Sequence, residues 1–340
     1  MASDHSVRPL LIRTLTALSW EAVPKSVRID LMDFQRIHVA FCLAAAEQLG
    51  YVVAALTAHG VPVAAFKGVT AAIILHGDIA AREYNDIDVI VPEAQVDEAE
   101  DVLESIGYRG PYDDRRFRHA FLAYQRQYMF LHSDQAAVDL HWAFTSSHLP
   151  FPLDVARIWP TLAKLPVGQH KVPAVSGANF ALLLAGHGAK ERWLSLGWVC
   201  DFAQLIECKR DLDWVEIYRR AHDRGSGDSI LLACAMAERL LNVPVPAELA
   251  RLLIARTRVR NLTGALVGDL RQGLPASQQR GSLADLILCD RRADRISAVL
   301  RLAVTPTPGD HAGLPLPPAL WPLYRFTRPF RLAAKMIGAH

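Results

Sequence analysis

The segment Asp86-Ile87-Asp88-Val89-Ile90-Val91 constrains the fold more than any other part of the sequence. Acidic and apolar residues alternate at its start and β-branched residues follow, which is typical of a β-strand. Side chains on a strand alternate between its two faces, so Asp86 and Asp88 are expected on one face and the apolar residues on the other. The strand therefore needs an apolar layer on one side and a partner for two neighbouring carboxylates on the other.

Two carboxylates that lie side by side repel each other, which raises one of their pKa values unless a cation lies between them. Oxygen ligands favour a hard cation that keeps some water and accepts phosphate oxygens, which describes Mg²⁺, with Mn²⁺ as a substitute. Asp139 supports a metal site because it lies in a second β-rich run, where a buried carboxylate needs a partner. We predict that Asp86, Asp88 and Asp139 are metal ligands and catalytic residues. The alternative is a structural pair between Asp88 and Arg82, with Asp86 ending the strand.

A second motif precedes this strand in the chain. The apolar run from Val63 to Phe66 predicts a short buried strand that leads directly into Lys67-Gly68 and a helix from Val69 to about His76. A glycine after a strand lets the backbone approach a phosphate closely, and the N-terminus of a helix offers free N–H groups to an anion. We therefore expect Lys67 and Gly68 to bind the phosphates of a nucleotide.

Four further residues are candidates for the same site. Arg82 is predicted to bind nucleotide, because a guanidinium suits phosphate in a bidentate manner. Lys190 is predicted to bind nucleotide, and His187 is predicted to support the site. The two residues are three apart in a helical segment, so they can share a helix face. The alternative for both is an ordinary position on the surface or between the lobes. His141 shares a strand face with Asp139 and is predicted to orient a carboxylate or assist as a base, with a core histidine as the alternative.

Composition and charge exclude several classes of protein. An apolar fraction of 51% and a charged fraction of 21% are those of a folded globular chain. The 37 basic and 35 acidic residues leave a net charge of +2, so no strong nucleic-acid footprint is expected.

The five cysteines lack the spacing of a disulfide framework or a zinc site. The first residues lack the features of a secretory signal and no apolar run reaches about 18 residues, so we expect a cytoplasmic protein without a transmembrane segment.

The pattern along the chain divides it into four parts. Helical spacing dominates from Ile29 to Leu56, two β-rich runs between 127 and 143 predict a hairpin, and helical spacing returns after Ala178. Prolines in 151–175 suggest a linker or lobe boundary there. We predict an α+β protein with an N-terminal helical segment (1–60) that packs on a catalytic lobe (61–150), a mainly helical lobe (151–304), and a proline-rich bridge with a basic, aromatic tail (305–340).

Together these motifs resemble a known family. The residues are Phe66-Lys67-Gly68, Arg82, Asn85-Asp86-Ile87-Asp88-Val89-Ile90-Val91 and Val138-Asp139-Leu140-His141-Trp142, and the likeness continues through Leu182–His187, Lys190, Trp193, Trp198, Asp201 and Asp213-Trp214. This set is similar to the uncharacterised nucleotidyltransferase family of the DNA polymerase β-like superfamily, over roughly residues 28–245. The resemblance implies a small mixed sheet, a phosphate loop between a glycine and a helix, an Asp-x-Asp pair and a third carboxylate on a neighbouring strand.

The resemblance also implies an activity. The expected reaction transfers a nucleoside monophosphate from an NTP, of which ATP is one candidate, to a hydroxyl or phosphate of a small-molecule, peptide or protein acceptor. One departure from the superfamily is that Lys67-Gly68 replaces its Gly-Ser or Gly-Gly, which removes a serine contact to the nucleotide.

Three other interpretations of the sequence concern the function and the tail. A metal-dependent glycosyltransferase is one, although the helical pattern of residues 1–60 disfavours it. A non-catalytic, partner-binding protein that keeps the fold is another. The tail from Trp321 to Lys335 mixes basic and aromatic residues, so it either contacts an anionic membrane or a partner, or packs on its own domain.

Overall fold

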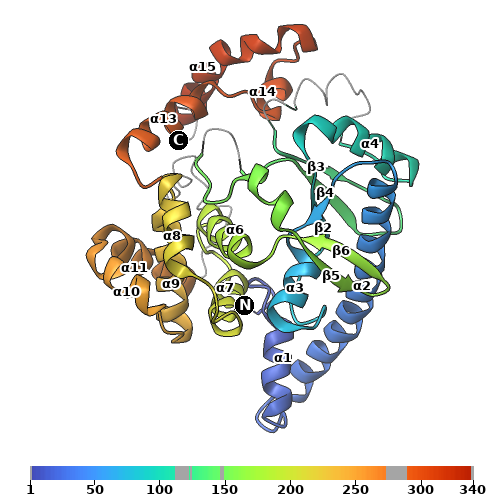
Figure 1. The fold of residues 1–340 in the computed structure, drawn as a ribbon, viewed down its shortest axis with the longest axis vertical. Helices are drawn as coiled ribbons and strands as arrows, with labels where there is room; N and C mark the ends of the chain where they lie inside the picture. The colour runs from blue at the N-terminus through green and yellow to red at the C-terminus, as the bar shows by residue number, and fades with distance from the viewer. Residues whose placement is uncertain (1, 112–121, 123–124, 146–148, 273–288, 338–340) are drawn as a thin grey trace.

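The computed structural model describes residues 2–111, 122, 125–145, 149–272 and 289–337. Figure 1 shows a sheet with the long helix α2 along it, a group of helices beside it that includes α6 to α11, and a C-terminal group that includes α13 to α15. The predicted α+β class is confirmed, as is the order of a sheet-containing part before a helical part.

The sheet has six strands in the order β3-β4-β2-β1-β6-β5. Pairs β2–β4 and β1–β6 are parallel, whereas β1–β2, β3–β4 and β5–β6 are antiparallel, so the sheet is mixed. The strands are β1 (Ala64–Ala65), β2 (Asp86–Ile90), β3 (Gln127–Phe130), β4 (Ala137–His141), β5 (Ala163–Val167) and β6 (His170–Ala174). The predicted hairpin is β3–β4, and the predicted strands at 63–66 and 86–91 are β1 and β2.

The two faces of the central strands pack on different partners. Ile87 and Val89 of β2 and Val138 and Leu140 of β4 belong to the same buried cluster as the apolar side of α2 and α4. Ile90 points to the other face and joins a larger cluster that contains the core of the helical lobe. Because alternate residues share a face, the acidic residues of β2 and β4 point toward the helical lobe.

Four helices and a short turn from the first part of the chain lie around the sheet. The 34-residue helix α2 (Lys25–Ala58) contacts β6, β5 and β2, and α1 (Arg8–Ala17) packs on α2. Helix α3 (Gly68–His76) follows β1 and contacts β2, and η1 (Glu93–Gln95) leads into α4 (Val96–Ser105), which packs on α2. Among the described residues, α2 alone is long and apolar enough to cross a membrane, and half of its most apolar stretch is buried in the protein, as in a core helix.

The predicted linker at 151–175 is wrong for most of its length. After the short turns η2 (Val155–Arg157) and η3 (Trp159–Thr161), the chain forms the β5–β6 hairpin, and β6 pairs with β1 at Ala65↔Ala174. The sheet thus continues past the boundary predicted at residue 150. The hairpin accepts Pro166 because β5 is an edge strand. On its outer side β5 pairs with no other strand, so the N–H that proline lacks is not needed for a sheet hydrogen bond there.

The helical lobe is built around α9 (Gly227–Leu241), which contacts α6, α7, α8, α10 and α11. Eleven consecutive residues of α9, from Gly227 to Ala237, are buried. The surrounding helices are α6 (Gly177–Lys190), α7 (Leu196–Cys208), α8 (Trp214–Asp223), α10 (Ala247–Ala255) and α11 (Thr257–Gln272).

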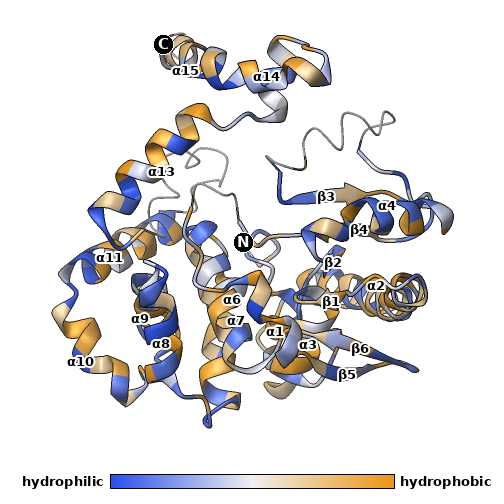
Figure 2. Cartoon of the chain, turned by 45° about the horizontal axis from the view of Figure 1, so that its top comes forward, coloured by the Kyte–Doolittle hydropathy of each residue, from blue (hydrophilic) through white to orange (hydrophobic). Residues whose placement is uncertain are grey.

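The C-terminal segment continues the helical pattern. It contains α13 (Arg292–Val304), α14 (Pro308–Gly313), η5 (Pro318–Leu323) and α15 (Tyr324–Ile337). Helix α13 packs against α15, and Figure 2 shows this segment as a separate layer beyond α11 and the sheet. The predicted tail is therefore helical from Tyr324 onward, although the side chain of Lys335 lies outside the described residues.

Candidate active site

The parallel strands β2 and β4 bring two predicted carboxylates together. Asp88 lies directly opposite Asp139 in the ladder, so both side chains leave the sheet on the same face. Both are buried, at 7% and 5% exposure. Buried carboxylates are unfavourable without compensation, so their neighbours determine what this pair does.

His141 bridges the two carboxylates. Its Nε2 lies 3.2 Å from Asp88 Oδ1 and 3.1 Å from Asp139 Oδ2. Burial lowers the pKa of His141, but its hydrogen bonds to Asp139 and Asp88 outweigh burial and raise it. The side chain also packs edge-on against Phe66, with ring centroids 4.8 Å apart. His141 thus contacts both carboxylates and also packs in the core, while its role as an orienting residue or a base stays a prediction.

These three residues fit a metal ion. One ligand atom each from Asp88, Asp139 and His141 lies within 4.8 Å of the others. Asp139 Oδ2 accepts a hydrogen bond from Gln127 Nε2 at 2.7 Å, while Asp139 Oδ1 is buried and has no hydrogen-bond partner among the described residues. An unpaired buried carboxylate oxygen beside a second carboxylate is the donor that a divalent cation would satisfy.

Asp86 lies at the edge of this cluster. It shares the sheet face of Asp88, two residues along β2, and is less buried. Burial and the negative charge of Asp88 raise the pKa of Asp86 to about 6, while Lys67 acts in the opposite direction. Asp86 is not part of the group whose ligand atoms meet within 4.8 Å, so its role as a ligand stays a prediction.

Lys67 and Gly68 lie at the strand-to-helix junction beside the carboxylates. Lys67 Nζ is 3.2 Å from Asp88 Oδ1. Burial would raise the pKa of Asp88, but the charge of Lys67 and the hydrogen bonds from His141 and Lys67 hold it below its ordinary value. Gly68 begins α3 with a φ of +49°, and a Cβ there would lie 3.3 Å from the backbone oxygen of Asp86. The junction thus needs glycine for both its backbone angle and its closeness to β2.

Arg82 has a different partner from the one that the sequence suggested. Its Nε donates to Asp201 Oδ2 at 2.7 Å, which joins the loop before β2 to α7. The alternative of a pair between Arg82 and Asp88 is therefore wrong. Burial lowers the pKa of Arg82, but the charge and the hydrogen bond of Asp201, together with the charges of Asp88 and Asp86, outweigh burial and raise it. Arg82 fixes the helical lobe against the site, and its contact with nucleotide stays a prediction.

Helix α6 forms the opposite side of the site. His187 lies in the last turn of α6, where its ring packs edge-on against Trp198 at 5.4 Å. Burial lowers the pKa of His187 well below its ordinary value, and the positive charges of Lys67 and Lys190 lower it further. His187 is thus neutral and close to both lysines. Lys190 lies 3.8 Å from Glu191 and is about one third exposed, so its ammonium remains accessible.

Two contributors to this arrangement were not among the predicted site residues. Gln127 lies on β3 and holds Asp139, and Asp201 on α7 holds Arg82. The sequence feature that could have indicated Gln127 is the predicted hairpin, because the register of its two strands places Gln127 opposite His141. The signal for Asp201 was its place among the residues that resemble the family.

Comparisons with known proteins identify the family. The family model described as "Uncharacterised nucleotidyltransferase" matches residues 1–242. The comparison with curated proteins found no match. Solved structures similar to this chain include the crystal structure of ANT(2")-Ia in complex with adenylyl-2"-tobramycin, at 16% identity and a TM-score of 0.31, covering 66% of this chain and 97% of that one. The solution structure of the antibiotic-resistance factor ANT(2'')-Ia matches at 16% identity and a TM-score of 0.28, covering 65% and 94%.

The two structural similarities are too weak to support an argument about this chain. The family match stands on its own, since it spans more than two thirds of the chain and includes every residue of the cluster described above. The resemblance seen in the sequence is confirmed. The chain belongs to the uncharacterised nucleotidyltransferase family and is an enzyme that transfers nucleotides.

Proposed function

We propose that this enzyme transfers a nucleoside monophosphate from an NTP to a hydroxyl or phosphate of its acceptor, with Mg²⁺ held by Asp86, Asp88 and Asp139. The observation that carries the proposal is the pairing of Asp88 with Asp139 on parallel strands, together with the buried Asp139 Oδ1, which has no hydrogen-bond partner among the described residues, and Lys67 at the adjacent helix N-terminus. Nucleotides are supplied in the cytoplasm, so a cytoplasmic location is part of the proposal.

The proposed reaction is an in-line displacement. An oxygen of the acceptor forms a bond to the α-phosphorus, the bond from that phosphorus to the bridging oxygen breaks, and pyrophosphate leaves with the electron pair. When the acceptor is a hydroxyl, its proton passes to a carboxylate oxygen of the site that is not bound to the metal. A bound Mg²⁺ would neutralise charge on the phosphates and lower the pKa of the hydroxyl.

The chain's own residues position the two substrates. Gly68 lets the backbone at the start of α3 approach the phosphates, and the free N–H groups of that helix end face them. Lys67 neutralises charge from the same side, beside Asp88. Lys190 is proposed to approach the triphosphate from α6, with the neutral ring of His187 filling the space between the two lysines.

His141 is proposed to position the carboxylates. Its Nε2 already contacts both of them, and an imidazole ligand suits Mn²⁺ and softer metals better than Mg²⁺. If His141 only orients Asp88 and Asp139, its replacement by Gln should lower metal affinity without changing which metal the enzyme prefers.

The test is a transfer assay with labelled nucleotide. Each of the four NTPs, labelled at the α-phosphate, is incubated with the protein, Mg²⁺ and a cell extract, and label is followed into any other species. Label from the α-phosphate should be transferred and label from the γ-phosphate should not, because the latter would indicate a kinase. The variants Asp88→Asn and Asp139→Asn should be inactive, while Asp33→Asn, an exposed aspartate on α2, should behave as wild type. Transfer by Asp139→Asn at the wild-type rate would refute the proposed site.

A further inference from the structure

Two arginines of helix α15, Arg328 and Arg331, pair with an acidic residue of the same segment. Arg328 is buried at 4% exposure, and its guanidinium lies 2.7 Å from Asp310 Oδ2. Arg331 Nε lies 2.6 Å from the other oxygen of Asp310, and Arg328 Nε donates to the backbone oxygen of Leu302 at 2.8 Å. The buried pair of Arg328 with Asp310 fixes the rotation of the helix, because separating the two would leave a buried charge without a partner.

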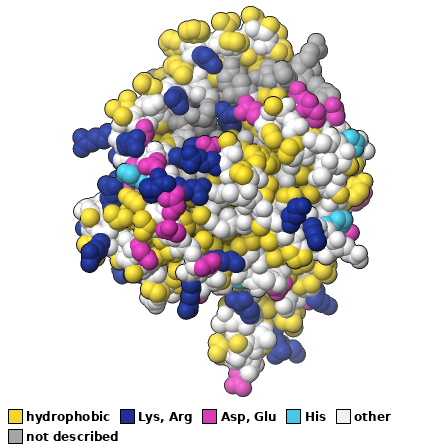
Figure 3. Space-filling view, in the orientation of Figure 1, with side chains coloured by type: hydrophobic (Ala, Val, Ile, Leu, Met, Phe, Trp, Pro, Cys, Tyr) yellow, Lys and Arg dark blue, Asp and Glu magenta, His cyan; other side chains and the backbone are white. Residues whose placement is uncertain are grey.

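The opposite side of α15 is aromatic and faces outward. Phe326 and Phe330 are 72% and 78% exposed, and Leu323, just before the helix, is also exposed. These residues recur at spacings of three and four, so they share one face. An ordinary surface helix buries its apolar face and exposes its charges, whereas α15 buries Arg328 and exposes Phe326 and Phe330. Figure 3 shows hydrophobic side chains gathered over the C-terminal helices at the top of the molecule.

The neighbouring helix α13 is also apolar on its outside. Ile296 and Leu300 are 62% and 63% exposed and lie one turn apart. Exposed apolar surface on two packed helices is unusual for a surface in contact with water alone, and it marks an interaction site.

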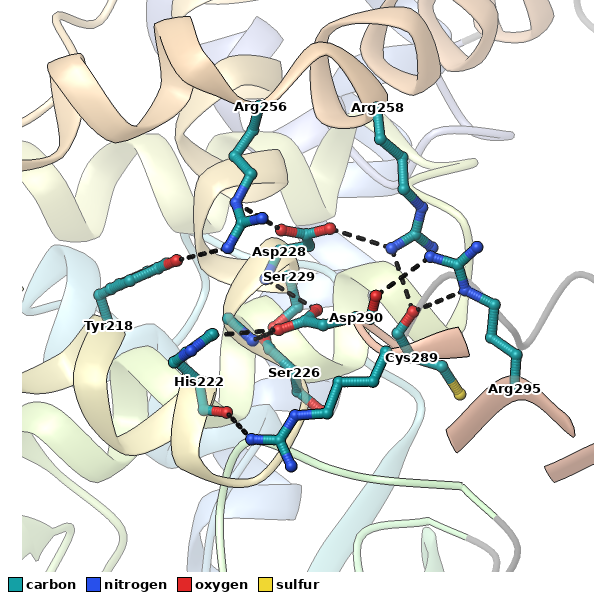
Figure 4. Close-up of polar contacts among 12 residues, drawn as sticks. Tyr218, His222, Ser226, Asp228, Ser229, Arg256, Arg258, Cys289, Asp290 and Arg295 are labelled. Atoms are coloured by element: carbon teal, nitrogen blue, oxygen red, sulfur yellow. Dashed lines mark hydrogen bonds and ion pairs between the residues drawn. The ribbon is translucent and has the colours of Figure 1, made fainter. Parts of the chain in front are cut away.

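A polar network fixes the base of this segment to the helical lobe (Figure 4). Asp290 accepts hydrogen bonds from the first N–H groups of α9, at 2.6 Å from Gly227 and 3.0 Å from Asp228. Arg258 and Arg295 both donate to the backbone oxygen of Cys289 at 3.0 Å. The base of the segment is therefore anchored to the helical lobe at Asp290, and Asp310 joins α14 to α15 within the segment.

The charge of the segment selects the kind of partner. From residue 291 onward the sequence contains eight Lys and Arg but only two Asp and no Glu, while the whole chain has a net charge of +2. One of the two acidic residues, Asp310, is neutralised by Arg328 and Arg331. Exposed Arg301 and Arg325 lie on α13 and α15. Two copies of so basic a segment would repel each other, which disfavours self-association through this face.

We propose that α13 and α15 form a membrane-contact face, which binds the headgroup region of an anionic lipid bilayer. Aromatic and aliphatic side chains enter the interface and surface arginines contact acidic headgroups, as in an interfacial amphipathic helix. The contact is peripheral and does not require a transmembrane segment. It lies on a part of the chain outside the family match at 1–242.

The test is sedimentation of the full-length protein with vesicles. Vesicles of phosphatidylcholine with 30% phosphatidylglycerol should bind the protein, pure phosphatidylcholine should bind it weakly, and high salt should weaken binding. The double variant Phe326→Ser/Phe330→Ser should lower affinity roughly tenfold or more. The matched control Ile37→Ser/Ile254→Ser removes two side chains of similar exposure, 73% and 71%, from elsewhere on the surface and should leave affinity unchanged.

Three further measurements separate vesicle binding from misfolding and from self-association. Circular dichroism and light scattering establish that each variant is folded and whether it self-associates. In Phe326→Trp, tryptophan fluorescence should shift to the blue on addition of anionic vesicles. The proposal would be overturned if both double variants lost vesicle binding equally, or if the wild type did not bind vesicles. It would also be overturned if the wild type bound no vesicles but self-associated with rising concentration, and Phe326→Ser/Phe330→Ser abolished that self-association.

Discussion

Asp88 and Asp139 lie directly opposite each other on parallel strands, and a single nitrogen, His141 Nε2, contacts both. The sheet face opposite to this pair is wholly apolar at the neighbouring positions of β2 and β4. The strands are thus held by a core on one side, while the other side concentrates charge toward the helical lobe. This division leads to several predictions.

Asp86→Asn and Asp88→Asn should change the stability of the metal-free protein in opposite directions at pH 7. Asp88 is stabilised in its ionised form by Lys67 and His141, so its replacement should lower the free energy of unfolding by about 1–3 kcal/mol. Asp86 is destabilised in its ionised form by burial and by Asp88, so its replacement should leave stability unchanged or raise it. Urea unfolding with EDTA measures both, and loss of stability in both variants would show that Asp86 is not under repulsion.

The pH dependence of stability should report Asp86. Its pKa rises from 3.8 to about 6 on folding, so the folded state binds more protons than the unfolded state between these values. Stability of the metal-free protein should therefore fall as pH rises from about 4 to 6, by no more than about 3 kcal/mol. Thermal melts across this range should show the fall in wild type and a smaller one in Asp86→Asn. Identical profiles for the two proteins would assign the effect to other groups.

Gly68→Ala should impair both folding and nucleotide binding. The left-handed backbone and the approach to Asp86 should together cost about 1–3 kcal/mol and displace the start of α3. Gly60→Ala is the matched control, because Gly60 also has a positive φ but nothing lies within 4 Å of its added Cβ. The expected result is a larger loss of stability for Gly68→Ala and weaker NTP binding for that variant alone. Equal effects in the two variants would mean that closeness to β2 is unimportant.

Arg82→Gln should destabilise the protein by about 3–5 kcal/mol, because it leaves Asp201 buried and unpaired. Asp201→Asn should have an effect of similar size, and the double variant should cost less than the sum of the two. Chemical denaturation of the three variants tests this double-mutant cycle. An Arg82→Gln variant of wild-type stability that has lost only nucleotide affinity would show that Arg82 serves the substrate alone.

The sequence predicted the local features of this fold better than its long-range ones. The alternation in 86–91 and the β-rich runs around Asp139 identified strands and the face of each carboxylate, because strand periodicity is a local property. The pair of Arg82 with Asp201 joins positions 119 residues apart, which no local pattern reveals. The β5–β6 hairpin was missed because Pro166 and Pro173 suggested a linker. The position of β5 at the sheet edge, which no local pattern reveals, explains why that strand tolerates Pro166.

The most direct test of the proposed site is equilibrium dialysis of labelled NTP against wild type, Asp139→Asn and Asp33→Asn, each with Mg²⁺ or with EDTA. Asp139→Asn keeps an oxygen that can accept a hydrogen bond from Gln127, so its fold should persist while its metal affinity falls. We expect wild type and Asp33→Asn to bind NTP in Mg²⁺ but not in EDTA. In Mg²⁺, Asp139→Asn should bind NTP more weakly than wild type by at least about tenfold. NTP binding by wild type that is equally strong in EDTA, or that Asp139→Asn retains in full, would contradict it.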